Sequence, residues 1–130
     1  NPSPADSWEE GVFAYDFYNE SDLTTSLNIG SKVTKITNYM FSGVRMRSVY
    51  IYPAIKEICK GAFYDCRIFT GLSCNHTTPP TLAEDAFEDC EKMYFIKVPE
   101  EAMDTFKSAP NWSDFNRNNS YGQNFYRSID

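Results

Sequence analysis

The sequence has no cluster of basic residues. Its 12 Lys and Arg residues are scattered singly among 18 Asp and Glu residues, and the formal net charge of the 130 residues is −6. Nucleic acids and anionic membranes bind concentrated basic surfaces, so we expect neither as a partner. No apolar run approaches the ~20 residues that cross a bilayer, so we also expect no direct insertion into a membrane.

The sequence is also poor in groups that hold metals and cofactors. His76 is its only histidine, and the cysteines Cys59, Cys66, Cys74 and Cys90 are separated by 7, 8 and 16 positions, without a C-x-x-C pair. Zinc sites use paired cysteines or several histidines. Phosphate loops use a glycine-rich cluster before a helix, which this sequence lacks. We therefore expect no metal and no cofactor.

No pair of residues is arranged for catalysis. Cys74 and His76 lie at the end of an expected strand and in the loop after it. We expect Cys74 to point into the core and His76 to lie in solvent, so that the two side chains point in different directions; the alternative is a Cys–His nucleophilic pair. Acidic pairs such as Glu84 and Asp85 lie in turns, where they serve solvation. We predict that the chain is not an enzyme.

What the sequence does contain is a repeat. Phe41, Phe63 and Phe87 recur at intervals of 22 and 24, and each is preceded by Met or Ala and followed three positions later by Val or Cys. A period of this size is typical of a solenoid of stacked coils. We expect the three rings, together with Cys66 and Cys90, to form the structural core.

Cys66 and Cys90 occupy the same position in successive repeats. We expect them to lie in neighbouring coils as small buried apolar groups. A disulfide between them in an oxidising compartment is the alternative, and it depends on side-chain directions that spacing does not supply.

Each repeat also contains a short strand. Two apolar residues separated by one position come late in each repeat, and this alternation places both side chains on one side of a strand. Stacked coil upon coil, the strands form a parallel sheet along one side of the solenoid. The predicted strands are Ser26–Gly30, Ser48–Tyr52, Gly71–Asn75 and Phe95–Pro99.

The two ends differ from the repeats. Residues 11–18 alternate in the manner of an edge strand. After the repeats, acidic residues open a helical stretch that Pro110 ends, and Trp112 and Phe115 offer apolar surface to seal the last coil. The end of the chain is polar and turn-rich, so we expect an extended or loosely packed tail. The expected parts are an N-terminal cap with this edge strand at 1–23, about three full repeats and one partial repeat at 24–99, a helical cap at 100–115 and a polar tail at 116–130.

Residues 55–66 and 86–99 follow the pattern I-x-x-I-x-x-x-A-F-x-x-C-x-x-L-x-x-I-x-I-P in part, and residues 98–115 close the array. These segments resemble the BspA-like leucine-rich repeat family, and the resemblance covers residues 24–115. It implies a leucine-rich-repeat solenoid of the α/β type, with short parallel strands, turn segments, an N-terminal strand cap and a C-terminal helical cap. Cys59 stands where this repeat usually has Gly.

Members of this family are typically secreted or surface-anchored proteins of gut and oral Bacteroidetes and of some spirochaetes and protists. The resemblance implies recognition or adhesion at the cell surface, with a host or envelope protein, or a glycan, as the partner. The sequence begins at Asn1 without an initiator Met, as expected of a trimmed mature chain. We therefore expect an exported protein, extracellular or at a bacterial cell surface, whose signal and anchor are not present in this chain.

The expected binding site is the outward side of the strands. Large rings that face solvent on a sheet are typical of protein interfaces and of sugar platforms. The alternative is that loops, the N-terminal strand or the C-terminal tail cover these rings. We predict a non-catalytic recognition or adhesion module, with a structural spacer or presentation domain of an envelope assembly as the alternative. The candidate residues are Tyr50, Tyr52, Asn75, Phe95 and Lys97.

Overall fold

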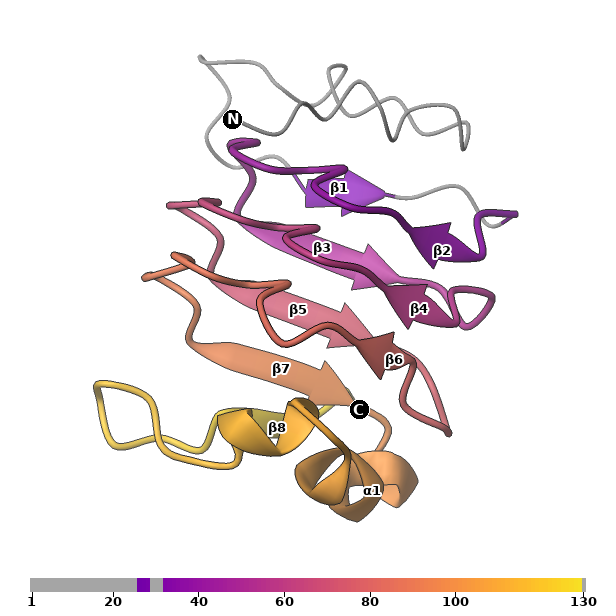
Figure 1. Ribbon diagram of the computed structural model, residues 1–130. Helices are drawn as coiled ribbons and strands as arrows, with labels where there is room; N and C mark the ends of the chain where they lie inside the picture. Colours follow the sequence, from indigo (N-terminus) through magenta and orange to yellow (C-terminus); the bar gives the residue numbers. More distant parts are fainter. Residues whose placement is uncertain (1–25, 29–31, 130) are drawn as a thin grey trace.

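The computed structural model describes residues 26–28, by their backbone, and residues 32–129. In this part of the chain the strands form two parallel sheets, with the orders β1-β3-β5-β7-β8 and β2-β4-β6 (Figure 1). The predicted cap at 1–23 and its edge strand at 11–18 lie outside the described residues. The strands are β1 (Ser26–Asn28), β2 (Lys35–Ile36), β3 (Ser48–Ile51), β4 (Glu57–Ile58), β5 (Gly71–Cys74), β6 (Thr81–Leu82), β7 (Phe95–Val98) and β8 (Tyr126–Ser128).

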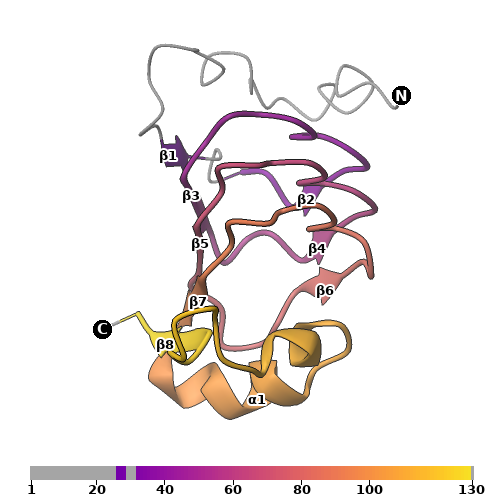
Figure 2. The same ribbon diagram turned by 90° about the vertical axis from the view of Figure 1, so that its left-hand side faces the viewer.

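Successive repeats lie one above another, and the two sheets occupy opposite sides of the stack (Figure 2). Neighbouring strands are parallel and in register, so that Tyr50 of β3 lies opposite Ser73 of β5, and Ser73 lies opposite Lys97 of β7. These are the equivalent positions that the sequence pattern predicts. The parallel strands and their alignment are therefore confirmed.

Local alternation correctly located three strands of the first sheet. β3, β5 and β7 begin at the predicted residues and end one residue earlier than predicted. The second sheet was not predicted, because β2, β4 and β6 have two residues each, which is too short for a period of two to be visible.

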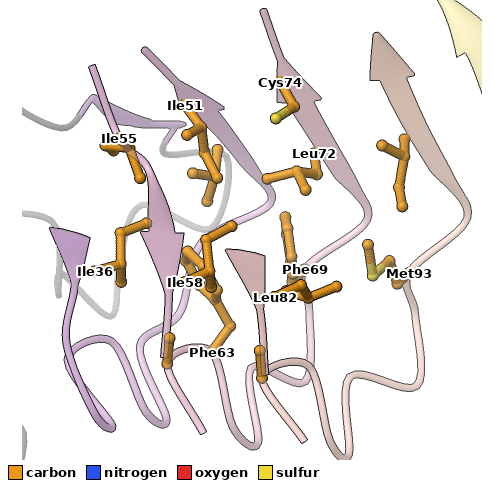
Figure 3. Close-up of a cluster of buried hydrophobic side chains, with 14 of the residues drawn as sticks. Ile36, Ile51, Ile55, Ile58, Phe63, Phe69, Leu72, Cys74, Leu82 and Met93 are labelled. Carbon is orange, nitrogen blue, oxygen red and sulfur yellow. The ribbon is translucent and has the colours of Figure 1, made fainter. Parts of the chain in front are cut away.

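The core lies between the two sheets (Figure 3). In β3 and β7, partly buried and buried residues alternate, so the inward side chains of the first sheet meet those of the second. Side chains of both sheets and of the segments between them are fully enclosed: Ile36, Ile51, Ile55, Ile58, Phe63, Phe69, Leu72, Cys74 and Ile96 have 0% exposure.

The repeated rings stack on one another. The ring centroids of Phe41 and Phe63 are 5.6 Å apart, and those of Phe63 and Phe87 are 5.1 Å apart with an interplanar angle of 2°. Phe41 and Phe63 are fully buried, as predicted, whereas Phe87 and Cys90 are only partly buried. The reason is their place in the last repeat, where Phe115 packs against Phe87 edge-on at 6.0 Å instead of a further stacked ring.

The turns that carry these rings form a ladder of their own. The amide of Phe41 donates to the carbonyl of Ala62 at 2.9 Å, and the amide of Phe63 donates to that of Ala86 at 2.8 Å. The thiol of Cys66 donates to the carbonyl of Phe41 at 3.2 Å, and that of Cys90 to Phe63 at 2.9 Å. Both cysteines are free thiols in this structure, and each joins two successive repeats.

The predicted helical stretch is present. A 3₁₀ turn at Glu100–Ala102 leads into α1 (Met103–Ser108), which ends two residues before Pro110, and a second 3₁₀ turn spans Trp112–Phe115. Trp112 is 1% exposed, and its indole N–H donates to the carbonyl of Pro80 at 2.7 Å. This hydrogen bond ties the segment to the loop before β6.

The expectation of a loosely packed tail is wrong for its last residues. β8 pairs in parallel with β7 and becomes the fifth strand of the first sheet, and Phe125 and Tyr126 are 3% exposed. The amide of Ile96 donates to the carbonyl of Phe125 at 2.7 Å. The edge of β7 offers unpaired backbone groups, and the apolar pair Phe125 and Tyr126 gives the tail enough buried surface to occupy it.

Candidate binding face

The outward side chains of the first sheet form one continuous row. Tyr50, Ser73, Lys97 and Arg127 come from β3, β5, β7 and β8 and lie opposite one another in the register of the sheet. All four are partly buried, which is the exposure expected of side chains that lie against a sheet and still reach solvent. We call the outward side of the first sheet, with the loop residues that border it, the strand face.

At the β3 end of the strand face, three of the predicted residues are in contact. The rings of Tyr50 and Tyr52 meet edge-to-face with centroids 4.9 Å apart. The side-chain amide of Asn75 donates to the hydroxyl oxygen of Tyr50 at 3.2 Å. Asn75 is exposed and the two rings are partly buried. The arrangement holds two amphipathic rings in fixed positions beside an accessible amide.

At the β7 end, Phe95 lies directly over Gly71 of β5. A Cβ atom added at Gly71 would overlap the Phe95 ring, so the glycine permits this close approach. Two cations lie over the same ring: Nζ of Lys97 is 5.5 Å and Cζ of Arg127 is 5.1 Å from its centroid. The ring quadrupole attracts both charges, so Phe95 holds them near one another on the sheet.

The structure therefore brings the five predicted residues into two groups, Tyr50 with Tyr52 and Asn75, and Phe95 with Lys97. Of the segments that could cover the rings, the N-terminal strand lies outside the described residues. The C-terminal tail reaches Phe95, where Arg127 lies over the ring. Sequence reasoning missed Arg127. No local alternation points to it, because residues 125–128 are two aromatic residues followed by two polar residues; the only sign is that apolar pair in a mostly polar tail.

Cys74 and His76 do contact each other, so the expected solvated position of His76 is wrong. His76 is 3% exposed, and its Nδ1 is 3.2 Å from Sγ of Cys74. Nε2 lies 2.6 Å from the carbonyl oxygen of Ile55, which can only accept, so Nε2 carries the proton and Nδ1 is the acceptor for the thiol. The loop turns His76 inward because this carbonyl offers its ring a buried partner.

This buried pair is unsuited to nucleophilic chemistry. Burial raises the pKa of the Cys74 thiol, and burial lowers the pKa of the His76 imidazole, although the hydrogen bond to Ile55 opposes the second shift. Both shifts favour the neutral forms, whereas a cysteine nucleophile must become a thiolate. Cys74 is fully buried as well, so the pair serves to join β5, its loop and the segment before β4.

A separate cleft lies on the last repeat. It encloses about 380 Å³ between the turn after β6 and the second 3₁₀ turn, with Phe87 and Phe115 among its walls. Its carboxylates come from both sides and are those of Glu84, Asp85, Glu88 and Asp114. None of the five predicted binding residues lines it. The cleft and the strand face are therefore two distinct surface features.

Residues 26–28 and 32–129 contain no group of three or more His, Cys, Asp and Glu side chains that could hold a metal ion. Within the same residues, no helix combines the length and the apolar character that spanning a bilayer requires.

Comparison with known proteins identifies the repeat. The family model for the BspA type leucine-rich repeat region matches residues 11–120, in six copies. On both sides, this match extends beyond residues 24–115, the range in which the repeat pattern is recognisable in the sequence. No curated protein matches the chain.

Proposed function

The chain belongs to the BspA-type leucine-rich repeat family, and from this premise we propose that it is a recognition module that binds a protein through its strand face. Leucine-rich repeat domains generally mediate protein interactions, and the family is typically non-catalytic. We take the stacked repeats to be a solenoid, in which each repeat adds one strand to a continuous surface.

The observation that carries the proposal is the contact of Tyr50 with Tyr52 and Asn75. The ring centroids of Tyr50 and Tyr52 are 4.9 Å apart, and the side-chain amide of Asn75 is 3.2 Å from the hydroxyl of Tyr50. These contacts hold two rings and an amide in place on the outward side of the sheet. Tyrosine anchors protein interfaces because it buries a large ring at a small cost in conformational entropy and keeps a polar tip. Side chains that are already fixed lose less freedom when a partner binds.

We further propose that the protein is exported and acts at a bacterial cell surface, as a recognition or adhesion module for a host or envelope protein. The family commonly includes secreted and surface proteins, which supports this location. A glycan is the second ligand class, because partly exposed tyrosine rings also suit sugar faces. A spacer or presentation domain is the competing role, favoured by the packing of Arg127 over part of the face.

The test is a binding screen of the purified chain against host-matrix proteins and a glycan array. The variant Tyr50→Ala/Tyr52→Ala/Phe95→Ala removes the rings of the strand face, and Tyr64→Ala is the control because it removes a partly buried ring from a turn segment. Circular dichroism verifies that both variants fold. We expect a protein ligand whose affinity falls at least about tenfold in the triple variant and is kept in Tyr64→Ala. Unchanged binding of every ligand by the folded triple variant would refute the proposal.

A further inference from the structure

Two like charges lie opposite each other on the strand face. Lys97 of β7 and Arg127 of β8 are partners in the register of the sheet, and both side chains point outward. Like charges directly opposite on neighbouring strands are destabilising. The cation–π contacts with Phe95 offset part of this repulsion but leave both positive charges in place.

No carboxylate of the described residues pairs with either charge. Within residues 26–28 and 32–129, ion pairs join Lys35 with Glu57 and Arg67 with Asp65, and neither pair includes Lys97 or Arg127. The chain has 18 acidic residues and a net charge of −6, so acidic side chains are abundant, yet those of the described residues form no ion pair with this couple. A cationic couple without an ion-pair partner among the described residues is a local feature, and its field is opposite in sign to that of the acidic chain as a whole.

The guanidinium of Arg127 is also held in position. Its Nε donates to the carbonyl of Asn124 at 3.1 Å, and one of its terminal nitrogens donates to the amide oxygen of Gln123 at 3.0 Å. A guanidinium has five N–H donors in a planar fork, so three remain beyond these two hydrogen bonds. Fixing the fork reduces the entropy that a ligand must remove when it binds.

We propose that Lys97 and Arg127 bind the carboxylates of an acidic segment of a protein partner that lies across the strand face. The carboxylate receives charge-assisted hydrogen bonds from the guanidinium and the ammonium. Phe95 beneath them and Ser73 and Tyr50 farther along the row contact the rest of the segment. The inference rests on the proposed function. It adds that the protein partner is acidic where it contacts Lys97 and Arg127.

The test uses the whole chain and three hexapeptides, hexaglutamate, hexaglutamine and hexalysine, in an NMR titration of backbone amides at low ionic strength. The overall charge of −6 repels a polyanion, so general electrostatic attraction cannot produce binding of hexaglutamate. We expect only hexaglutamate to bind at the strand face, with the largest shifts at residues 95–97 and 126–128. Hexalysine is attracted by the net charge and should shift residues outside these two ranges. The affinity for hexaglutamate should fall as salt is raised, because the charges of Lys97 and Arg127 are accessible to solvent.

Charge-reversal variants separate the site from the net charge. Lys97→Glu and Arg127→Glu should each lower the affinity for hexaglutamate at least about tenfold. Lys92→Glu changes the net charge equally at an exposed position outside the strands and should leave the affinity nearly unchanged. Three results would overturn the proposal. These are hexaglutamate shifts scattered over the surface, an equal loss of hexaglutamate affinity in all three variants, and stronger binding of a sulfated oligosaccharide than of hexaglutamate.

The two proposals fail in different ways. A protein partner that needs the rings of Tyr50 and Tyr52 but binds equally to Lys97→Glu and Arg127→Glu would refute the acidic segment and leave the recognition function standing. A partner that is indifferent to both sets of variants would remove the strand face as a binding site, and both proposals would fall.

Discussion

Nδ1 of His76 accepts from the thiol of Cys74, 3.2 Å away, while Nε2 of the same ring donates to the carbonyl of Ile55. One imidazole, in the loop between β5 and β6, thus joins β5 to the segment that leads into β4. Both of its nitrogen atoms are used by the neutral ring. Protonation of His76 would therefore disturb a contact between two parts of the fold.

Stability should fall in mild acid because of His76. Burial lowers its pKa in the folded state below the ordinary 6.5, so the unfolded chain takes up the proton first. The free energy of unfolding that the neutral ring contributes is therefore complete above pH 6.5. Between pH 6.5 and the lowered pKa it is lost as the pH falls, with a slope of at most about 1.4 kcal/mol per pH unit. Urea unfolding between pH 7.5 and 5.5 measures this slope. His76→Gln should abolish it, and an equal slope in the variant would contradict the assignment.

Truncating Phe63 should destabilise the chain more than truncating Phe87. Phe63 is fully buried between two stacked rings, so Phe63→Ala should lower the free energy of unfolding by about 3–5 kcal/mol. Phe87→Ala should cost less, because part of its ring already contacts water. Urea unfolding of the two variants measures the difference, and the reverse order would show that the last repeat carries more of the packing than its burial indicates.

Cys74 should resist thiol reagents in the folded protein. Its side chain is fully buried and burial raises its pKa, so thiolate is scarce and inaccessible. Cys90 is partly buried and should react first of the two. Labelling with iodoacetamide followed by peptide mass spectrometry reports each site. Rapid labelling of Cys74 without urea would restore a nucleophilic role for it.

The last strand should contribute to stability. The hydroxyl of Tyr126 donates to the carbonyl of Trp112 at 2.7 Å, and the ring is nearly fully buried. Tyr126→Phe leaves this carbonyl without its donor and should cost about 1 kcal/mol, whereas Tyr126→Ala should cost about 3–5 kcal/mol. Urea unfolding followed by tryptophan fluorescence measures both losses. If Tyr126→Ala unfolds at the same urea concentration as the unsubstituted chain, the tail strand does not belong to the cooperative fold.

Residues that repeat were predictable, because repetition is visible along the chain. The spacing of Phe41, Phe63 and Phe87 indicated stacking, and the alternation around Tyr50 and Lys97 placed their side chains outward in register. The two-residue strands of the second sheet were not predictable, since two residues show no period. Within the site, Tyr50, Tyr52 and Asn75 were predicted as members, but their mutual contacts depend on side-chain directions that spacing does not contain.

By itself the sequence determined the repeat, the inward rings and the row of outward positions, because each depends on a local period in apolar residues. Only the tertiary structure decided that the tail joins β7, that Arg127 thereby reaches Phe95, and that His76 turns inward to Ile55. These three contacts join residues from separate parts of the chain, or a loop residue to a distant carbonyl. These contacts are favourable because they pair the backbone groups of the β7 edge and satisfy a buried carbonyl. Both the edge and the buried carbonyl exist only once the repeats have stacked.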